Sequence, residues 1–537
     1  MLVLSGNSVW ADESGQTNFV WTGAAGSVWD NATNWNILSL TNTTRATRPP
    51  NSPQELDYVT FSGTTKNRTI DLGSTLKSVA GLSFAPSPGN SSGYTFNTSG
   101  LNAGSSGFGF ALGPQGIINT DTHPELFNAP IKLVNYGGGT LNGLIDVAIK
   151  ATPGALVFSG VWRDGPANVP TLDLNGATVV FQGSGNITFG AHNAPTIISS
   201  SGGGGSLIMN GTGTLILDGT SANTYTGGTF INSGSVYAGK FGALGNQGAL
   251  SVNGTGYLNV GNANESIGQL HLGGGTIAGG NATITLTSRS NNIESGSISA
   301  NLAGIGGITK TTPGAASLSG TNFYSGGTEV VAGALFVDGY KSTGVGPVQV
   351  DRGATLGGVG VIQTPLTLAS GSILEGGDAG VPGTLTTAKT LWSGGLTLNL
   401  QMNQANGKAG ANPGWGVVKS SGVVTISATP ANPITINLTS LTLGGQPGNA
   451  ANFNPDSVYT WLFATAAGSF VGFNTNQFKI STIDFANDPG DKRFFVEVLG
   501  KTNLYLVHVP EPGVGPLAVL GLGVLLFAGV VGGRRLR

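Results

Sequence analysis

The sequence repeats itself once in the middle of the chain: NTYTGGT at residues 223–229 returns as NFYSGGT at residues 322–328. Both stretches fit the pattern N-x-Y-[TS]-G-G-T. Each follows a Leu-x-Gly triplet and precedes an alternating apolar run, at 234–238 in one copy and 333–337 in the other. A strand–turn–strand unit of this kind cannot bury its apolar face alone, so we expect the copies to stack on neighbouring turns around one continuous core.

The residues that the two copies share predict the turn of the repeat. Paired glycines tolerate backbone angles with φ > 0, and asparagine or threonine at recurring positions can form side-chain ladders between turns. The residues that we expect to build the two turns are Asn223, Tyr225, Gly227, Gly228, Asn322, Tyr324, Gly326 and Gly327.

The chain around the repeats has the same character. Between residues 55 and 510, short runs with apolar residues at every second position alternate with Gly, Asn, Asp and Ser, as in TLIL at 214–217 and NATITLT at 281–287. This period of two is typical of strands with one buried face, and no sustained helical period interrupts it. The prediction is an all-β body. Composition alone leaves a stacked coil and an array of β-sandwich domains both open.

The segments 212–239 and 315–339 resemble the autotransporter-associated β-strand repeat, and residues 345–387 are similar to the turns that follow such repeats. The resemblance implies a right-handed parallel β-helix, a solenoid with capped ends. The alternative is the array of β-sandwich domains.

The C-terminal stretch 509–537 differs from everything before it. Residues 514–533 carry no charge and are long enough as a helix to cross a bilayer, and Arg534, Arg535 and Arg537 follow them. Basic flanks stay in the cytoplasm, which would leave the body outside. The tail is similar to the PEP-CTERM protein-sorting signal in Pro510, Glu511, Pro512, the apolar helix and the arginines. That resemblance implies recognition by an exosortase, cleavage near the Pro-Glu-Pro motif, and only a transient inner-membrane anchor.

The expected organisation has five parts: a truncated signal-peptide remnant (1–11), an N-terminal β cap (12–100), the β-helix (101–389), a C-terminal β region rich in aromatic residues (390–508) and the sorting signal (509–537). Trp21, Trp29 and Trp35 lie in the cap. Clustered tryptophans can stack on sugar rings, but more often they cover the open end of a solenoid, and we expect the cap.

Composition excludes several functions. The chain has no cysteine and a formal net charge of −2, with 9% charged residues, so it offers no disulfide, no thiolate site and no basic surface for nucleic acid. The acids Asp218, Glu265 and Glu294 are scattered, and Glu375, Asp378, Asp484, Asp488 and Asp491 fit loops better than a calcium site. The four histidines show no ligand spacing. We expect no cofactor and no metal.

The expected function is therefore an exported bacterial protein of the cell surface or extracellular matrix. Its role would be structural or adhesive, and it would not be an enzyme. Its expected partners are an exosortase-type processing enzyme and extracellular polysaccharide. The alternative is a β-helical polysaccharide lyase or hydrolase, because acids that are far apart in the sequence can converge on neighbouring turns.

Overall fold

The computed structural model describes residues 17–40, 57–62, 67–86, 92–99, 109–134, 146–151, 155–158, 171–190, 196–490 and 493–510. The expected signal remnant and the expected membrane helix at 514–533 lie outside these ranges. Among the described residues, no helix is long and apolar enough to span a bilayer. Two compact units divide the chain, one formed by residues 1–356 and 360–367 and the other by 357–359 and 368–537.

Strands make up nearly all the regular structure of the described residues, as predicted; the exceptions are two 3-10 turns, η1 (Ala32–Asn34) and η3 (Thr475–Gln477). The strands up to residue 368 are β1 Thr17–Trp21, β2 Trp35–Leu40, β3 Tyr58–Phe61, β4 Thr69–Asp71, β5 Leu76–Phe84, β6 Thr95–Asn97, β7 Gly109–Asn119, β8 Glu125–Phe127, β9 Ile131–Leu133, β10 Asp146–Ala151, β11 Leu156–Phe158, β12 Leu172–Asp173, β13 Thr178–Gln182, β14 Ile187–Phe189, β15 Ile198–Ser199, β16 Ser206–Met209, β17 Thr214–Leu217, β18 Gly228–Ile231, β19 Ser235–Ala238, β20 Leu250–Asn253, β21 Tyr257–Asn259, β22 Glu265–Ile267, β23 Leu270–Ala278, β24 Thr283–Leu286, β25 Ser290–Ile298, β26 Asn301–Gly304, β27 Gly307–Lys310, β28 Ala315–Leu318, β29 Thr328–Val330, β30 Ala334–Val337, β31 Val348–Val350, β32 Thr355–Gly357 and β33 Leu366–Leu368.

The strands after residue 368 are β34 Ile373–Glu375, β35 Gly377–Asp378, β36 Val381–Pro382, β37 Thr384–Thr387, β38 Thr390–Trp392, β39 Thr397–Met402, β40 Lys408–Ala409, β41 Gly414–Trp415, β42 Val417–Ser420, β43 Val424–Ile426, β44 Ile434–Ser440, β45 Tyr459–Ala466, β46 Phe470–Val471, β47 Phe478–Ser481, β48 Arg493–Leu499 and β49 Asn503–Val509.

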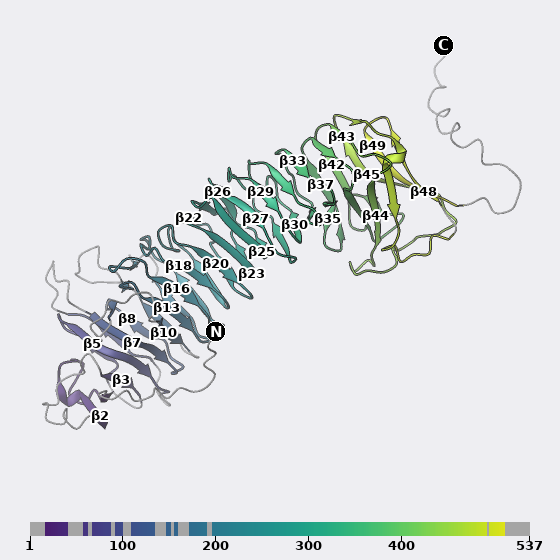
Figure 1. Cartoon of the computed structure of the whole chain (residues 1–537). Coiled ribbons are helices and arrows are strands. Elements are labelled where there is room, and N and C mark those ends of the chain that lie inside the picture. Colours follow the sequence, from purple (N-terminus) through teal and green to yellow (C-terminus); the bar gives the residue numbers. More distant parts are fainter. Residues whose placement is uncertain are drawn as a thin grey trace, which may run out of the picture. The chain divides into compact units, whose positions relative to one another are not determined.

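Strands of the first unit pair with strands one turn further along the chain. β13, β16, β18, β20 and β23 form one parallel column, whose neighbouring strands lie side by side in Figure 1. β17, β19 and β21 form a second column, in which Leu215 pairs with Val236 and Val236 with Leu258, so one turn here takes about 21 residues. β22, β24 and β26 form a third parallel sheet. This pairing is that of a parallel coil, and it argues against sandwiches, whose strands pair mainly antiparallel.

Alternation within each strand places the core between the columns. β16 and β17 both show one half-buried residue followed by one buried residue, twice over. The residues that face inward are apolar: Leu207, Leu215, Val236 and Leu258 are at most 1% exposed. Stacked turns thus bury the apolar face that a single turn would leave in water.

The N-terminal tryptophans are buried. Trp21 and Trp29 are fully buried and Trp35 is 7% exposed, and the ring of Trp35 lies 4.9 Å from Trp21 and 4.6 Å from Trp29 between ring centroids. The ring of Trp29 also packs on Phe110 of β7, at 5.5 Å. A buried ring cannot stack on a sugar, so the sugar-binding alternative for this cluster is wrong.

The second unit contains two kinds of sheet. β34, β39, β44 and β47 continue the parallel pairing, as do β38, β43 and β46. A five-stranded sheet in the order β37-β42-β45-β49-β48 ends instead in two antiparallel pairs, β45–β49 and β49–β48. The predicted domain boundaries at residues 100 and 389 remain predictions.

Candidate functional site

The repeat asparagines connect three successive turns. Asn223 accepts a hydrogen bond from the Ile198 N–H at 2.9 Å and donates from Nδ2 to the Ala243 carbonyl at 2.6 Å. Asn322 makes the same pair of bonds, accepting from Leu302 N–H at 2.8 Å and donating to the Ser342 carbonyl at 2.6 Å. Both asparagines are at most 2% exposed. Each side chain therefore satisfies a buried backbone group on the turn before it and another on the turn after it.

The repeat tyrosines are hydrogen-bonded to the threonine that ends the motif. Tyr225 Oη lies 2.6 Å from Thr229 Oγ1, and Tyr324 Oη lies 2.6 Å from Thr328 Oγ1. All four side chains are buried, and burial raises the pKa of both tyrosines well above the usual range. These groups stay neutral and serve the packing of the turn.

The explanation of the paired glycines needs a correction. Only Gly228 has a left-handed backbone, with φ of 116°; Gly227, Gly326 and Gly327 do not. At Gly227 and Gly326 the reason is close approach. A Cβ would lie 2.4 Å from the Gly205 carbonyl oxygen in the first case and 2.3 Å from the Gly307 nitrogen in the second. The first glycine of each pair lets two turns touch backbone to backbone.

The structure describes little of the predicted sorting motif. Pro510 directly follows β49 and is half-buried. Glu511, Pro512, Arg534, Arg535 and Arg537 lie outside the described residues.

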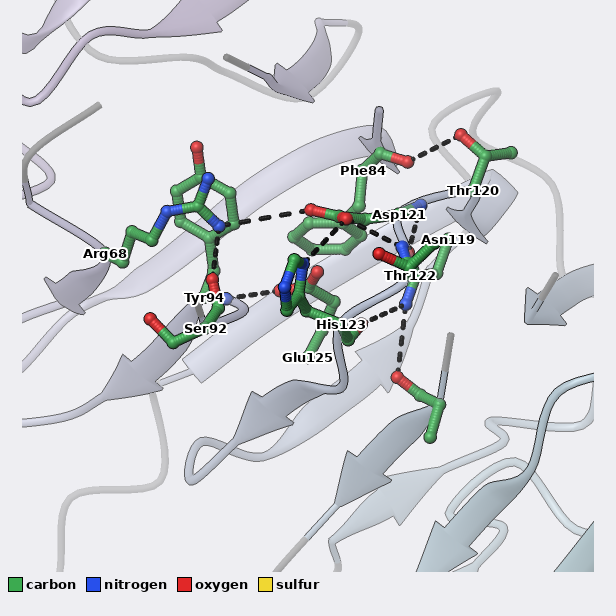
Figure 2. A network of polar contacts seen from close by, with 11 residues as sticks. Arg68, Phe84, Ser92, Tyr94, Asn119, Thr120, Asp121, Thr122, His123 and Glu125 are labelled. Atoms are coloured by element: carbon green, nitrogen blue, oxygen red, sulfur yellow. Dashed lines mark hydrogen bonds and ion pairs between the residues drawn. The ribbon is translucent and has the colours of Figure 1, made fainter. Parts of the chain in front are cut away.

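Turns near the N-terminal end gather a charged cluster that the sequence did not reveal (Figure 2). Arg68 donates to the Ser92 carbonyl at 2.6 Å, its guanidinium lies 4.6 Å from the centroid of the Tyr94 ring, and it is 4.0 Å from the carboxylate of Asp121. His123 Nδ1 lies 3.0 Å from Asp121 Oδ1. Glu125 accepts the N–H of Tyr94. Arg68 on one turn thus lies near a histidine and two carboxylates of the turn two further along, and Ser92 and Tyr94 come from the turn between them.

Burial sets the electrostatics of this cluster. Glu125 is fully buried, and desolvation raises the pKa of its carboxyl to about 8, since the Tyr94 N–H and the more distant Arg68 only partly offset that effect. Asp121 is 1% exposed, and its oxygens accept the Thr122 N–H at 2.7 Å and face His123. Carboxyls buried in this way are closed to a polymer in solution, and they accept hydrogen bonds from the backbone of the turns around them.

A second row of polar residues crosses three neighbouring strands. Ser251 Oγ on β20 lies 3.1 Å from His271 Nδ1 on β23, and His271 Nε2 lies 3.2 Å from Glu294 Oε1 on β25. Nucleophile, base and acid in this order are the parts of a hydrolase triad. However, Ser251 is 7% exposed and its hydroxyl also reaches Asn253 Oδ1 at 3.1 Å, within strands whose backbones form parallel ladders. We interpret the row as a side-chain ladder.

The remaining candidate acids have local roles. Asp218 accepts the N–H of Gly219 at 2.8 Å, as a turn-forming aspartate does. Glu265 is buried and accepts the N–H groups of Ala243 and Leu244, and burial raises the pKa of its carboxyl to about 7. Within the described ranges, no group of three or more His, Cys, Asp or Glu residues could hold a metal ion.

Of the other acids that we predicted in loops, Glu375 is instead the last residue of β34 and is buried. Glu375 accepts from Asn399 at 2.6 Å and from Gln401 at 3.0 Å, and Asp488 accepts the Gly490 N–H at 2.8 Å. Asp484 accepts from Asn437 at 2.8 Å. Asp378 belongs to the short β35–β36 hairpin, and Asp491 lies outside the described residues.

Comparison with known proteins identifies the class of the repeats first. The model of the passenger-associated-transport-repeat matches residues 207–237 and 308–336, so the chain carries two such repeats, and the predicted repeat segments are confirmed with slightly earlier bounds. One relative is the Adhesin BmaC autotransporter of Brucella suis biovar 1 (strain 1330). It is 38% identical over 111 residues, which are 20% of this chain and 3% of that protein. The chain thus matches a small part of that relative.

Proposed function

We propose that this chain is an exported bacterial protein of the cell surface or extracellular matrix, with a structural and adhesive role. The observation that carries the proposal is the double repeat, whose asparagine and tyrosine contacts are the same in both copies and whose segments match the passenger-associated-transport-repeat. The similarity of 111 residues to an autotransporter named as an adhesin supports the same role. Long stacked surfaces suit many weak contacts made at once.

The finer fold in this proposal is a right-handed parallel β-helix with capped ends. Parallel pairing with turns of about 20 residues supports a helix of strands, and crossovers between parallel strands are right-handed in nearly all proteins. Trp21, Trp29 and Trp35, packed on one another at the start of the described chain, suit a cap that keeps the first strands from pairing with other molecules.

The export route in this proposal uses the C-terminal stretch as a PEP-CTERM signal. An exosortase would recognise Pro510, Glu511 and Pro512, while the apolar segment and the arginines hold the chain transiently in the inner membrane. C-terminal peptide mass spectrometry on cell-bound and released fractions tests this step. Mature chains that end near Pro510 to Pro512 support it, and membrane fractions that retain peptides reaching Arg537 reject it.

The adhesive role is tested by deleting the gene in its native host and measuring attachment to surfaces coated with the host's matrix. We expect attachment to fall in the deletion strain and to return with the wild-type gene. Unchanged attachment and an unchanged matrix would reject the role.

The rival function is a polysaccharide lyase or hydrolase. The Arg68–Asp121–Glu125 cluster has the charged groups that such an enzyme uses, but the burial of both carboxyls speaks against this function. Such an enzyme needs two carboxylates or a carboxylate with a basic group at the sugar. An assay for reducing ends and unsaturated uronates on matrix polysaccharides separates the two functions. Release by the wild-type protein that disappears with Glu125→Gln would favour the enzyme.

A further inference from the structure

The second repeat carries an exposed aromatic pair that follows from its own turn. Asn322 and Tyr324 are tied inward by their hydrogen bonds, so Phe323 between them faces outward, and it is 52% exposed. Tyr340 on the next turn is 53% exposed. Single exposed rings need no explanation, but two exposed rings on neighbouring turns can form part of a contact surface.

Lysine links the two rings. Lys341 Nζ lies 5.8 Å from the centroid of the Phe323 ring and 5.5 Å from that of Tyr340, within the range of cation–π attraction. Gln363 donates to the hydroxyl of Tyr340 at 2.7 Å, which fixes that ring from the other side. Two flat apolar faces, an ammonium group and a side-chain amide therefore share one corner of the solenoid. We call Phe323, Tyr340, Lys341 and Gln363 the aromatic–lysine corner.

The backbone at Lys341 is strained for a side chain. Its φ is 58°, in the left-handed region, and the residue at the matching place of the first repeat is Gly242 with φ of 66°. A residue with a Cβ is disfavoured in this conformation relative to glycine, and such backbone strain can accompany a functional site. The first repeat also has Thr224 in place of Phe323, although it keeps an exposed ring, Phe241, at the place of Tyr340. In the second repeat, the residue with the strained backbone thus carries the ammonium group that lies near the two rings.

We propose that the aromatic–lysine corner binds extracellular polysaccharide built from uronic acids. This proposal rests on the proposed adhesive function and names its partner. Pyranose rings present flat apolar C–H faces that stack on aromatic rings, and the carboxylate of a uronate pairs with an ammonium group in a way that a neutral sugar cannot. One corner binds weakly, and a polymer chain held by many protein copies multiplies the contact.

The experiment is affinity electrophoresis of the full-length chain in native gels that contain polygalacturonate, dextran or polyglutamate. We expect polygalacturonate alone to retard the wild-type protein. Polyglutamate tests charge without a sugar ring, and dextran tests a sugar without charge. Retardation by polyglutamate equal to that by polygalacturonate would reject the sugar, and equal retardation by dextran would reject the uronate.

Four variants locate the site. Phe323→Ala and Tyr340→Ala should each weaken retardation by about fivefold or more, as loss of an aromatic anchor does. Phe241→Ala is the matched control, because it removes an exposed ring from the equivalent place, where the neighbouring Lys240 is buried and donates to the Thr196 carbonyl. It should leave retardation unchanged. Lys341→Gly should lose retardation while the melting temperature stays equal or rises, because glycine relieves the left-handed backbone.

Two outcomes overturn the proposal. One is a wild-type protein that migrates equally with and without polygalacturonate. The other is a loss of retardation as large in Phe241→Ala as in Phe323→Ala. If instead Phe323→Ala converts a dimer to a monomer in size-exclusion chromatography and polygalacturonate has no effect, the corner is a contact between two copies and the polysaccharide proposal fails. None of these results bears on whether the chain reaches the cell surface.

Discussion

Tyr225 Oη lies 2.6 Å from Thr229 Oγ1 inside the core, and Tyr324 Oη lies at the same distance from Thr328 Oγ1 ninety-nine residues later. The threonine hydroxyls in turn approach the carbonyls of Leu244 at 3.4 Å and Thr343 at 3.2 Å on the following turn. The asparagine, tyrosine and threonine of the motif therefore form a set of buried hydrogen bonds that satisfies backbone groups where two turns stack. We call this set of bonds the clasp. It explains why the repeat keeps asparagine, tyrosine and threonine at fixed spacing.

The clasp makes a first prediction. Asn322→Ala leaves the Leu302 N–H and the Ser342 carbonyl buried without their partner, which should reduce stability by about 2–4 kcal/mol. Hydrogen exchange measures this directly, and we expect the Leu302 amide to exchange much faster. Asn232→Ala is the control, because Asn232 bonds only to its exposed ladder neighbours Asn210 and Asn253. Equal protection in Asn322→Ala and wild type would contradict the clasp.

Close approach at the paired glycines gives a second prediction. Gly326→Ala places a Cβ 2.3 Å from the Gly307 nitrogen, so the turns must separate, and we expect a loss of about 1–3 kcal/mol in urea unfolding. Gly444→Ala has its nearest foreign atom at 3.7 Å and should change little. A variant at Gly326 as stable as the Gly444 variant would show that the turns are not packed as described.

Buried carboxyls predict how stability depends on pH. Glu125 has its pKa raised from 4.5 to about 8 in the folded chain, so the folded state keeps a proton that the unfolded state loses. Its contribution is fully present below pH 4.5 and is lost as the pH rises to about 8. Glu265, with a pKa of about 7, acts in the same direction.

Thermal melting between pH 4 and pH 9 checks this effect. The melting temperature of the wild type should fall as the pH rises across that window. Glu125→Gln should flatten part of this slope, because the side-chain amide of glutamine does not titrate between pH 4 and pH 9. The groups around Glu125 (Arg68, Asp121 and His123) remain in that variant, so an unchanged slope would place the effect elsewhere.

The sequence was sufficient to predict the strands and the two repeats. The alternation of apolar residues and the return of N-x-Y-[TS]-G-G-T at residue 322 are local patterns, which can be read directly from the sequence. The explanation of the glycine pairs by a left-handed backbone was wrong at Gly227, Gly326 and Gly327. At Gly227 and Gly326 the reason is close approach between turns, which depends on a neighbour outside the motif.

The charged cluster and the Ser251–His271–Glu294 row were not predictable. Their members meet only across turns, and the length of a turn varies: Leu156 pairs with Ile187, whereas Leu258 pairs with Ile277. With no fixed repeat length, the register that brings Arg68 to Asp121 cannot be counted from the sequence. The left-handed backbone at Lys341 was not predicted either, because it shows only in the φ angle of the folded chain.

Surface exposure tests the central claim most directly. Intact native cells would be treated briefly with trypsin, and the released peptides would be identified by mass spectrometry beside a cytoplasmic control protein. We predict that peptides from the body, such as those ending at Lys341 and Lys389, are released while the control stays intact. Body peptides that appear only after lysis, in cells that express the protein, would contradict export to the surface and the adhesive role with it.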